Sequence, residues 1–425
     1  AVAGSRHSMG GQCFATDDWL VDMRGCDALQ RFDCERGLVT IGSGACWPAV
    51  IAACRAADAP GATSWSIRQK QTGADDLSLG GSLAANVHGR GARMPPLVAD
   101  VESFELVDAR GELVHCDRAS DPRLFAHVIG GYGMFGVVTA VTLRLMPRLL
   151  LERNVGVCDA DAALAAIAAI DTSAWIYGDF QFEIDPRARG FLRRGVWSTY
   201  RRTDQDRAVP QRQVELARDE WRRLLELAHT DPTRAFASYA AHYLRTDGQL
   251  YWSDTHQLST YLDGYHADLD AALGDAHRGS EMITELYVRR ERLLEFLDAA
   301  ARVLRARDAR VIYGTIRFVE RDAETALAWA REPWACVIFN LHVQSGDAGR
   351  ARSRDDFRAL IDVAADLGGS YYLTYHRWAS RAQLVRCHPS IEAVLREKQR
   401  CDPLGVLTSD WYRHTRALVD GTVPA

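Results

Sequence analysis

Three runs rich in glycine, at residues 4–11, 80–91 and 130–136, are the features of this sequence that bear most directly on chemistry. Glycine has no Cβ, so the backbone of such a run can approach a bulky, flat or anionic ligand closely. Its successive N–H groups can also converge on an anion. One run alone is equally well explained by a tight turn. Three runs within the first 136 residues indicate one segment wrapped around one large cofactor.

The first run contains His7, in the sequence Gly-Ser-Arg-His-Ser. A neutral imidazole is a nucleophile and can form a covalent bond to a ligand. Considered without its context, a loop histidine more often only hydrogen-bonds the backbone. The residue type alone therefore leaves both roles of His7 open.

The hydrophobic pattern predicts elements that hold these runs in place. Alternating apolar and polar residues predict half-buried strands at 101–107 and 137–145, and 38–44 is typical of a strand closed by glycine. A helix is predicted at 47–57, with its proline tolerated in the first turn.

The third run matches the Gly-x-Gly-x-x-Gly spacing of a dinucleotide-binding fingerprint, at Gly131, Gly133 and Gly136. That fingerprint must open a helix. Here it precedes the β-branched residues of the strand predicted at 137–145. We therefore reject a Rossmann fold.

The central part of the chain mixes longer helical and strand patterns, which is typical of an α+β domain. The predicted elements are helices at 214–227 and 293–305 and strands at 281–288, 311–319 and 335–343. The stretch 251–266, rich in Ser, Thr, Asp and His, is predicted to form a loop over the site.

Composition and charge argue against several classes of protein. The net charge of −5 gives no reason to expect nucleic acid or an anionic membrane as a partner. No apolar run is long enough to span a membrane. Ten cysteines, without a CxxC pair or zinc spacing, predict free thiols in a reducing cytoplasm and no metal site. Arginine supplies all but two of the 51 basic residues, which points to a GC-rich, bacterial genome.

The glycine runs and two C-terminal segments together resemble a known family. The C-terminal segments are Gly-Gly-Ser-Tyr-Tyr-Leu at 368–373 and Cys-Asp-Pro at 401–403. The sequence resembles the vanillyl-alcohol oxidase/p-cresol methylhydroxylase family of FAD-linked oxidoreductases. Within it, the similarity is to the sugar-oxidising branch of alditol oxidase, aldonolactone oxidase and decaprenylphosphoryl-ribose oxidase.

The resemblance implies a two-domain α+β fold, in which a PCMH-type FAD-binding domain carries an α+β substrate cap. The FAD-binding domain would occupy residues 1–149 and the cap 150–370, and the segment 371–425 would return to the FAD domain. We expect the first strand–helix unit of the FAD domain to be missing ahead of residue 1, so that this subdomain is incomplete.

The cofactor implied by the resemblance is FAD, bound covalently through His7. A second covalent bond through Cys46 is not expected, because doubly linked relatives carry their cysteine in the later glycine run. The residues expected to bind FAD are Gly4, Ser5, Arg6, His7, Ser8, Met9, Gly10, Gly80, Gly81, Ser82, Ala85, Asn86, His88, Gly89, Gly136, Val137 and Val138.

The reaction implied is oxidation of a CH–OH group of a sugar, polyol or sugar lactone, with hydride passing to flavin N5 and electrons to oxygen or another acceptor. We expect His376 to be the base because histidine titrates near neutrality, with Tyr375 as the alternative. His88 matches a position that lies beside the flavin in relatives. Its two possible roles, orienting the substrate and making a structural hydrogen bond, are given equal weight. Expected substrate-binding residues are Arg317, Glu320 and Arg377, with Glu281, Glu285 and Asn340 as weaker candidates.

The sequence departs from the branch at one motif. Alditol and lactone oxidases carry His-Trp-x-Lys where this chain has His-Arg-Trp-Ala at 376–379, and the lysine of decaprenylphosphoryl-ribose oxidase is absent. For Arg317 and Glu320, a solvated surface ion pair remains the alternative. Two other functions stay open: a decaprenylphosphoryl-ribose-type dehydrogenase acting in an epimerising pair, and a non-catalytic flavin-binding protein.

Overall fold

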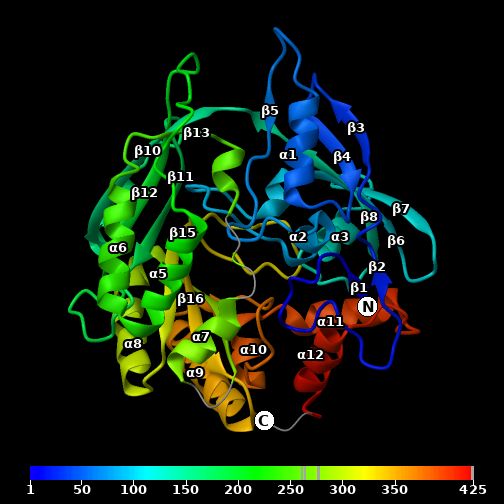
Figure 1. Ribbon diagram of the computed structural model, residues 1–425. Helices are drawn as coiled ribbons and strands as arrows, with labels where there is room; N and C mark the ends of the chain where they lie inside the picture. The colour runs from blue at the N-terminus through cyan, green and yellow to red at the C-terminus, as the bar shows by residue number, and fades with distance from the viewer. Residues whose placement is uncertain (260–261, 263–264, 275–277, 423–425) are drawn as a thin grey trace.

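Two antiparallel sheets and the helices around them make up the molecule (Figure 1). The computed structural model describes residues 1–259, 262, 265–274 and 278–422. Within these residues, no helix combines the length and the apolar character needed to cross a membrane. The mixture of helices and antiparallel sheets confirms the predicted α+β class.

The first sheet has five strands and belongs to the N-terminal part of the chain, at the right of Figure 1. Its order is β3 (Leu29–Asp33), β4 (Leu38–Gly42), β8 (Val137–Arg144), β6 (Val101–Val107) and β7 (Leu113–Asp117). Three helices accompany it: α1 (Trp47–Ala56), α2 (Leu79–Ala85) and α3 (Pro122–Val128). Short strands β1 (Val2–Ala3), β2 (Val21–Asp22), β5 (Trp65–Ser66) and β9 (Met146–Pro147) and the 3-10 turn η1 (Leu97–Asp100) complete this part.

The second sheet has eight strands, at the left of Figure 1. Its order is β13 (Leu250–Trp252), β10 (Leu150–Asp159), β12 (Arg194–Arg202), β11 (Trp175–Phe182), β15 (Val311–Val319), β16 (Trp334–Gln344), β14 (Gly279–Arg289) and β17 (Ser370–Tyr371). Its helices are α4 (Ala160–Ala168), α5 (Arg218–Thr230), α6 (Pro232–Leu244), α7 (Tyr265–Leu273), α8 (Leu293–Ala306) and α9 (Asp347–Asp366), with 3-10 turns η2 (Thr255–Gln257) and η3 (Arg290–Arg292).

The C-terminal helices α10 (Arg381–Cys387), α11 (Ile391–Cys401) and α12 (Asp410–Asp420) follow the second sheet. Helices α11 and α12 lie beside the N-terminal strands β1 and β2 (Figure 1). Asp410 accepts hydrogen bonds of 2.8 Å from both the backbone and the hydroxyl of Thr16, and Arg413 donates to Asp18 at 2.6 Å. These contacts join the two ends of the described chain.

Apolar periodicity accounts for the elements that match the sequence prediction. The buried residues of α8 recur at Leu293, Phe296, Leu297, Ala300, Ala301 and Leu304, which is the spacing of one helical face. Strands β6 and β15 have the predicted bounds, and the helix predicted at 214–227 begins instead at Arg218. The predicted loop at 251–266 contains the end of β13, all of η2 and the start of α7. Residues 260, 261, 263 and 264 of it lie outside the described residues.

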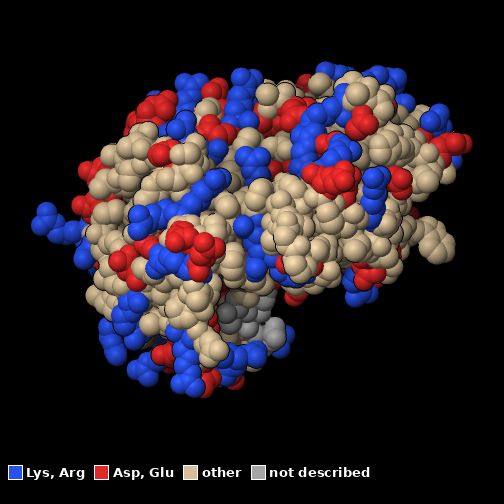
Figure 2. All heavy atoms as spheres, turned by 90° about the horizontal axis from the view of Figure 1, so that it is seen from above, with Lys and Arg blue, Asp and Glu red and all other residues tan. Residues whose placement is uncertain are grey.

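The surface carries charges of both signs. Figure 2 shows basic and acidic side chains interspersed over the face seen from above. Both lysines are exceptions, because each is buried: Lys70 lies 2.6 Å from Asp75, and Lys398 pairs with Asp402.

Candidate active site

All three glycine runs border one cavity between the two sheets. The first run contributes Gly4, Ser5, Arg6, His7, Ser8 and Met9. The second contributes Gly80, Gly81, Leu83, Ala84, Ala85 and Val87, and the third Tyr132, Gly133, Phe135, Gly136 and Val138. The opposite wall consists of Gln71, Thr72, Gly73, Ala74, Ile283, Tyr372, Thr374 and Tyr375. The cavity therefore joins the N-terminal part of the chain to β14 and to the segment after β17.

The second glycine run is partly helical, contrary to our expectation of a glycine turn that binds an anion. Helix α2 starts after Ser78, whose hydroxyl accepts a 3.3 Å hydrogen bond from the Gly81 backbone. The backbone N–H of Gly80 donates to the Ser43 carbonyl at 2.7 Å. Gly80 instead permits close packing, since a Cβ there would lie 3.0 Å from the Ser43 Cβ. In the first run, a Cβ on Gly4 would lie 2.0 Å from the Ser78 hydroxyl, at the start of α2.

The first run places His7 at the edge of the cavity with an exposed side chain. Arg6, just before it, adopts a left-handed backbone with φ of 60°. Gly10 lies off the cavity, and its N–H donates to the Thr374 carbonyl at 3.0 Å. This bond fastens the first run to the segment that follows β17.

Several predicted cofactor residues do not line the cavity, namely Gly10, Ser82, Asn86, His88, Gly89 and Val137. Ser82 accepts a 3.1 Å hydrogen bond from the Trp47 indole. Asn86, left-handed at φ 47°, donates to Asp322 at 3.0 Å. A Cβ on Gly89 would lie 2.6 Å from the Lys70 carbonyl. These residues shape the packing behind the cavity.

The far end of the cavity holds a chain of polar contacts that starts at Tyr375. Its hydroxyl accepts from the Gln71 amide at 3.3 Å and donates to Oε2 of Glu285 at 3.5 Å. Oε1 of Glu285 lies 2.5 Å from Nε2 of His88. The side chains of His88 and Glu285 are 1% and 0% exposed. The contacts thus run from the cavity wall into the protein interior.

The His88–Glu285 contact is a short hydrogen bond. Nδ1 of His88 lies 3.0 Å from the Gly89 carbonyl, which only accepts, so Nδ1 carries a proton. Nε2 and a carboxylate oxygen at 2.5 Å would repel each other without a proton between them. Burial, followed by the charge of Glu285, raises the pKa of Tyr375 well above its usual value. Tyr375 is therefore a neutral phenol that contacts the buried carboxylate of Glu285.

The face of the eight-stranded sheet next to this chain carries polar atoms without hydrogen-bond partners. Glu285 and Thr315 both pair with Ile338, and Ile283 pairs with Asn340, so they share the face that Ile283 turns to the cavity. Among the described residues, the buried atoms on this face that lack a partner include Nε and Nη1 of Arg317, Oγ1 of Thr315, Oδ1 of Asn340, Oε1 of Gln181 and Oδ1 of Asp179. Buried polar groups are normally paired, so this face is suited to a polar ligand.

The structure places His376, the expected base, away from the cavity. β17 ends at Tyr371, so residues 372–378 do not form a strand. His376 is 4% exposed, and its ring lies 4.8 Å from the Phe357 ring and 5.7 Å from the Trp378 ring. Its Nε2 lies 3.3 Å from the Thr284 hydroxyl. It does not line the cavity, and burial lowers its pKa to about 3, so the neighbouring Tyr375 occupies the expected position.

Two of the three predicted substrate residues also lie elsewhere. Arg377 is exposed and donates to the Asp410 carbonyl at 3.1 Å. Glu320 pairs with Arg290 at 2.9 Å and with Arg93 at 3.4 Å, rather than with Arg317. None of the three lines the cavity. Arg317 stands on the polar sheet face described above.

Sequence reasoning missed the segment 71–74, which forms one wall of the cavity. Lys70 holds it in place: its ammonium donates to the Gln71 carbonyl at 2.9 Å and lies 2.6 Å from Asp75. A lysine in a chain whose basic residues are otherwise nearly all arginine was the available signal.

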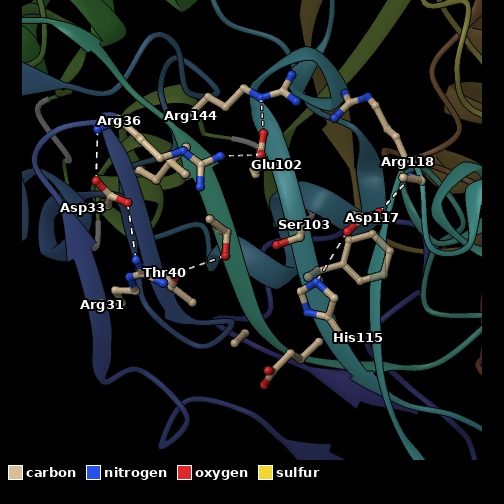
Figure 3. A pocket seen from close by; sticks show the side chains of 16 residues that line it. Arg31, Asp33, Arg36, Thr40, Glu102, Ser103, His115, Asp117, Arg118 and Arg144 are labelled. Carbon is tan, nitrogen blue, oxygen red and sulfur yellow. Dashed lines mark hydrogen bonds and ion pairs between the residues drawn. The ribbon is translucent and has the colours of Figure 1, made fainter.

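A second hollow lies on the five-stranded sheet, away from every predicted site residue (Figure 3). Its charged side chains largely satisfy one another, as in the pairs of Glu102 with Arg36 at 3.3 Å and with Arg144 at 2.5 Å. Thr40 and Thr142 also hydrogen-bond each other at 2.9 Å. Such mutual pairing gives no orphaned group for a ligand.

Residues 1–117 match the FAD binding domain family. The chain carries an FAD-binding domain. The walls of the cavity fit FAD. Two glycine-containing segments and α2 line it, and larger side chains at these glycines would intrude into the space. The predicted PCMH-type fold class is confirmed.

Similarity to one relative extends over nearly the whole chain. The L-gulono-1,4-lactone dehydrogenase of Mycobacterium tuberculosis (strain ATCC 25618 / H37Rv) is 26% identical over 415 residues, which is 97% of this chain and 89% of that enzyme. This similarity confirms the predicted resemblance to the vanillyl-alcohol oxidase/p-cresol methylhydroxylase family and its aldonolactone-oxidising branch.

Other relatives match over shorter stretches. Cytokinin dehydrogenase 2 of Oryza sativa subsp. japonica is 33% identical over 35% of this chain, and the uncharacterized oxidoreductase ORF5 in the fasciation locus of Rhodococcoides fascians is 34% identical over 34% of it. The matched region spans only 26% and 31% of these two proteins, respectively.

Proposed function

We propose that this protein is an FAD-dependent oxidoreductase that oxidises a CH–OH group of a sugar, polyol or sugar lactone. The observation that carries the proposal is the chain Tyr375–Glu285–His88, which begins at the wall of the cavity and ends in the interior. The similarity to a lactone dehydrogenase along the whole chain supports the same chemistry.

Oxidation of an alcohol removes a hydride from carbon and a proton from oxygen. FAD, when bound, supplies the acceptor for the hydride. The phenol of Tyr375 accepts the hydroxyl proton while it passes its own to Oε2 of Glu285, whose other oxygen contacts His88. A neutral tyrosine suits this relay, since it needs no phenolate. The proton therefore leaves the cavity for a buried carboxylate.

The polar sheet face supports a substrate with several hydroxyl groups. The guanidinium of Arg317 offers donors, and the oxygens of Asn340 and Gln181 offer acceptors, in a buried setting that leaves them unpaired. A hydrogen bond from a charged guanidinium to a substrate oxygen is stronger than one between two neutral groups. An apolar substrate would leave these groups unsatisfied, at a cost of about 1–3 kcal/mol each.

Covalent attachment of FAD through His7 is part of the proposal. His7 is exposed at the cavity edge, where its imidazole is free to react. Cys46 stands off the cavity, with its thiol 3.2 Å from the Ser5 hydroxyl and donating to the Asp76 carbonyl at 3.2 Å. This arrangement favours one covalent link. We propose that the enzyme works in the reducing cytoplasm of a bacterium, in line with its free cysteines.

The proposal is tested by offering polyols and aldonolactones to the purified flavoprotein, under air and with an artificial electron acceptor. The expected result is a product that has lost two hydrogens, identified by mass spectrometry. Turnover with the artificial acceptor alone would identify a dehydrogenase, and turnover under air an oxidase. If no member of the panel is consumed under either condition, the proposed substrate class is wrong.

A further inference from the structure

A second cluster of ionisable side chains lies on the same sheet, away from Tyr375. Glu281 on β14 and His342 on β16 occupy directly paired positions, so their side chains share one face of the sheet. His229 reaches them from the last turn of α5. Glu281 is four positions before Glu285, or about 13 Å along the strand. The cluster is therefore separate from the proposed proton relay.

The three side chains approach one another as closely as ligands of one ion. Nε2 of His229 lies 3.1 Å from Oε1 of Glu281, and Nδ1 of His342 lies 3.7 Å from the same oxygen. One ligand atom from each lies within 4.8 Å of the others. Ligands about 2.0–2.1 Å from a tetrahedral ion are about 3.4 Å apart, so little movement is needed.

The cluster is buried. The side chains of His229, Glu281 and His342 are 0%, 5% and 3% exposed. Nε2 of His229 faces the Glu281 carboxylate, whereas Nδ1 of His229 has no hydrogen-bond partner among the described residues. Buried polar atoms of this kind call for a further partner.

We infer that His229, Glu281 and His342 form a binding site for a divalent transition-metal ion, with Zn²⁺ as the best match. Two imidazoles and a carboxylate favour zinc and its neighbours over Mg²⁺ and Ca²⁺, which prefer sets of oxygen ligands. The ion would tie α5 to β14 and β16. It would lie about 13 Å along the strand from Glu285 of the relay.

Neighbouring groups orient the carboxylate as outer ligands do in metal sites. The hydroxyl of Tyr265 donates to Oε2 of Glu281 at 2.7 Å, and Nδ1 of His266 lies 3.1 Å from the same oxygen. His266 is 44% exposed, so this side of the cluster opens to solvent.

The test is metal binding by the full-length flavoprotein after treatment with a chelator and removal of the chelator. Zn²⁺ is titrated in competition with a chromophoric indicator, and Co²⁺ is added separately as a spectroscopic probe. The expected result is about one tightly held Zn²⁺ per chain and a Co²⁺ spectrum typical of four-coordinate nitrogen and oxygen ligation. His229→Gln and Glu281→Gln should each weaken Zn²⁺ binding by more than about 100-fold, beyond the loss typical of an outer-shell change.

The control is His242→Gln, which removes a buried histidine of α6 outside the cluster. It should bind Zn²⁺ as the unchanged chain does, with the same flavin absorption. The inference is overturned if the unchanged chain gives no four-coordinate Co²⁺ spectrum. It is equally overturned if Zn²⁺ binding survives Glu281→Gln and is lost in His88→Gln, which would place the ion at His88, Glu285 and Cys336.

Discussion

The hydroxyl of Tyr375 lies 3.5 Å from Oε2 of Glu285, across the boundary between the segment after β17 and strand β14. The two residues are 90 positions apart. A second bond joins the same segment to α2, since the Tyr372 hydroxyl donates to the Ala85 carbonyl at 2.7 Å. The proposed proton relay therefore forms only when the FAD-binding part and the eight-stranded sheet are assembled.

Replacing Tyr375 by phenylalanine removes the first proton acceptor without changing the shape of the cavity wall. Reduction of the flavin by substrate should slow by about 10²–10⁴, the usual effect of losing a general base. The spectrum of the oxidised flavin should not change. His376→Asn is the matched control, and its rate should stay close to that of the unchanged enzyme. The opposite ranking of these two variants would restore His376 as the base.

Acid should destabilise the protein through two buried histidines. Burial lowers the pKa of His376 to about 3, and burial followed by the charge of Arg331 does the same for His388. Below the unfolded value of 6.5, the unfolded chain binds protons that the folded chain does not, so stability falls as pH falls. Each histidine contributes about 1.4 kcal/mol per pH unit across this window.

Urea unfolding at several pH values measures this effect. His388→Leu should have a shallower loss of stability between neutral and acid pH, whatever its stability at neutrality. His115→Gln, at a side chain 57% exposed, should keep the slope of the unchanged protein. Equal slopes for all three proteins would contradict a depressed pKa at His388.

Arg317 should contribute to substrate binding more than to the chemical step. Arg317→Met removes the charge and the unpaired donors while it retains an apolar stem. KM should rise by about 10-fold or more, since hydrogen bonds to charged groups contribute about 1.5–3 kcal/mol. The rate at saturating substrate should change much less, and Arg377→Met, at an exposed position, should alter neither quantity. A fall in the saturated rate with constant KM would place Arg317 in the chemical step instead.

Covalent attachment is tested by acid precipitation of the protein. Flavin should remain with the unchanged chain and with Cys46→Ser, and should appear in the supernatant for His7→Ala. FAD should still bind His7→Ala before precipitation, because the glycine-containing segments remain. Release of all flavin from the unchanged chain would refute the link through His7, and flavin on a Cys46 peptide would refute a single link.

Local pattern predicts much of this fold. Strands β6 and β15 follow from alternating apolar residues, and α8 from its apolar spacing. Helix α2 was not predictable, because Gly80 and Gly81 disfavour a helix. Tertiary contacts decide in its favour: Ser78 caps it, and Gly80 packs against Ser43, where a Cβ would meet that residue at 3.0 Å.

The candidate site was predictable only in part. The glycine runs predict a cofactor cavity because so many glycines in a short stretch are unusual. The relay is assembled from His88, Glu285 and Tyr375, and His88 and Glu285 are 197 positions apart. His376 was preferred over Tyr375 from its ordinary pKa, which burial removes. The proposed metal site was not predictable either. Its residues His229, Glu281 and His342 are far apart in the sequence and form no local motif.

The most direct test of the proposed oxidation is anaerobic reduction of the bound flavin, followed by its visible absorption, with polyols and aldonolactones as reductants. The account predicts that at least one of them bleaches the flavin, and that deuterium at the oxidised carbon slows the bleaching because a C–H bond breaks. Dithionite serves as the control that the flavin is reducible. If dithionite bleaches the flavin and no polyol or lactone does, the protein is not an oxidoreductase of this substrate class.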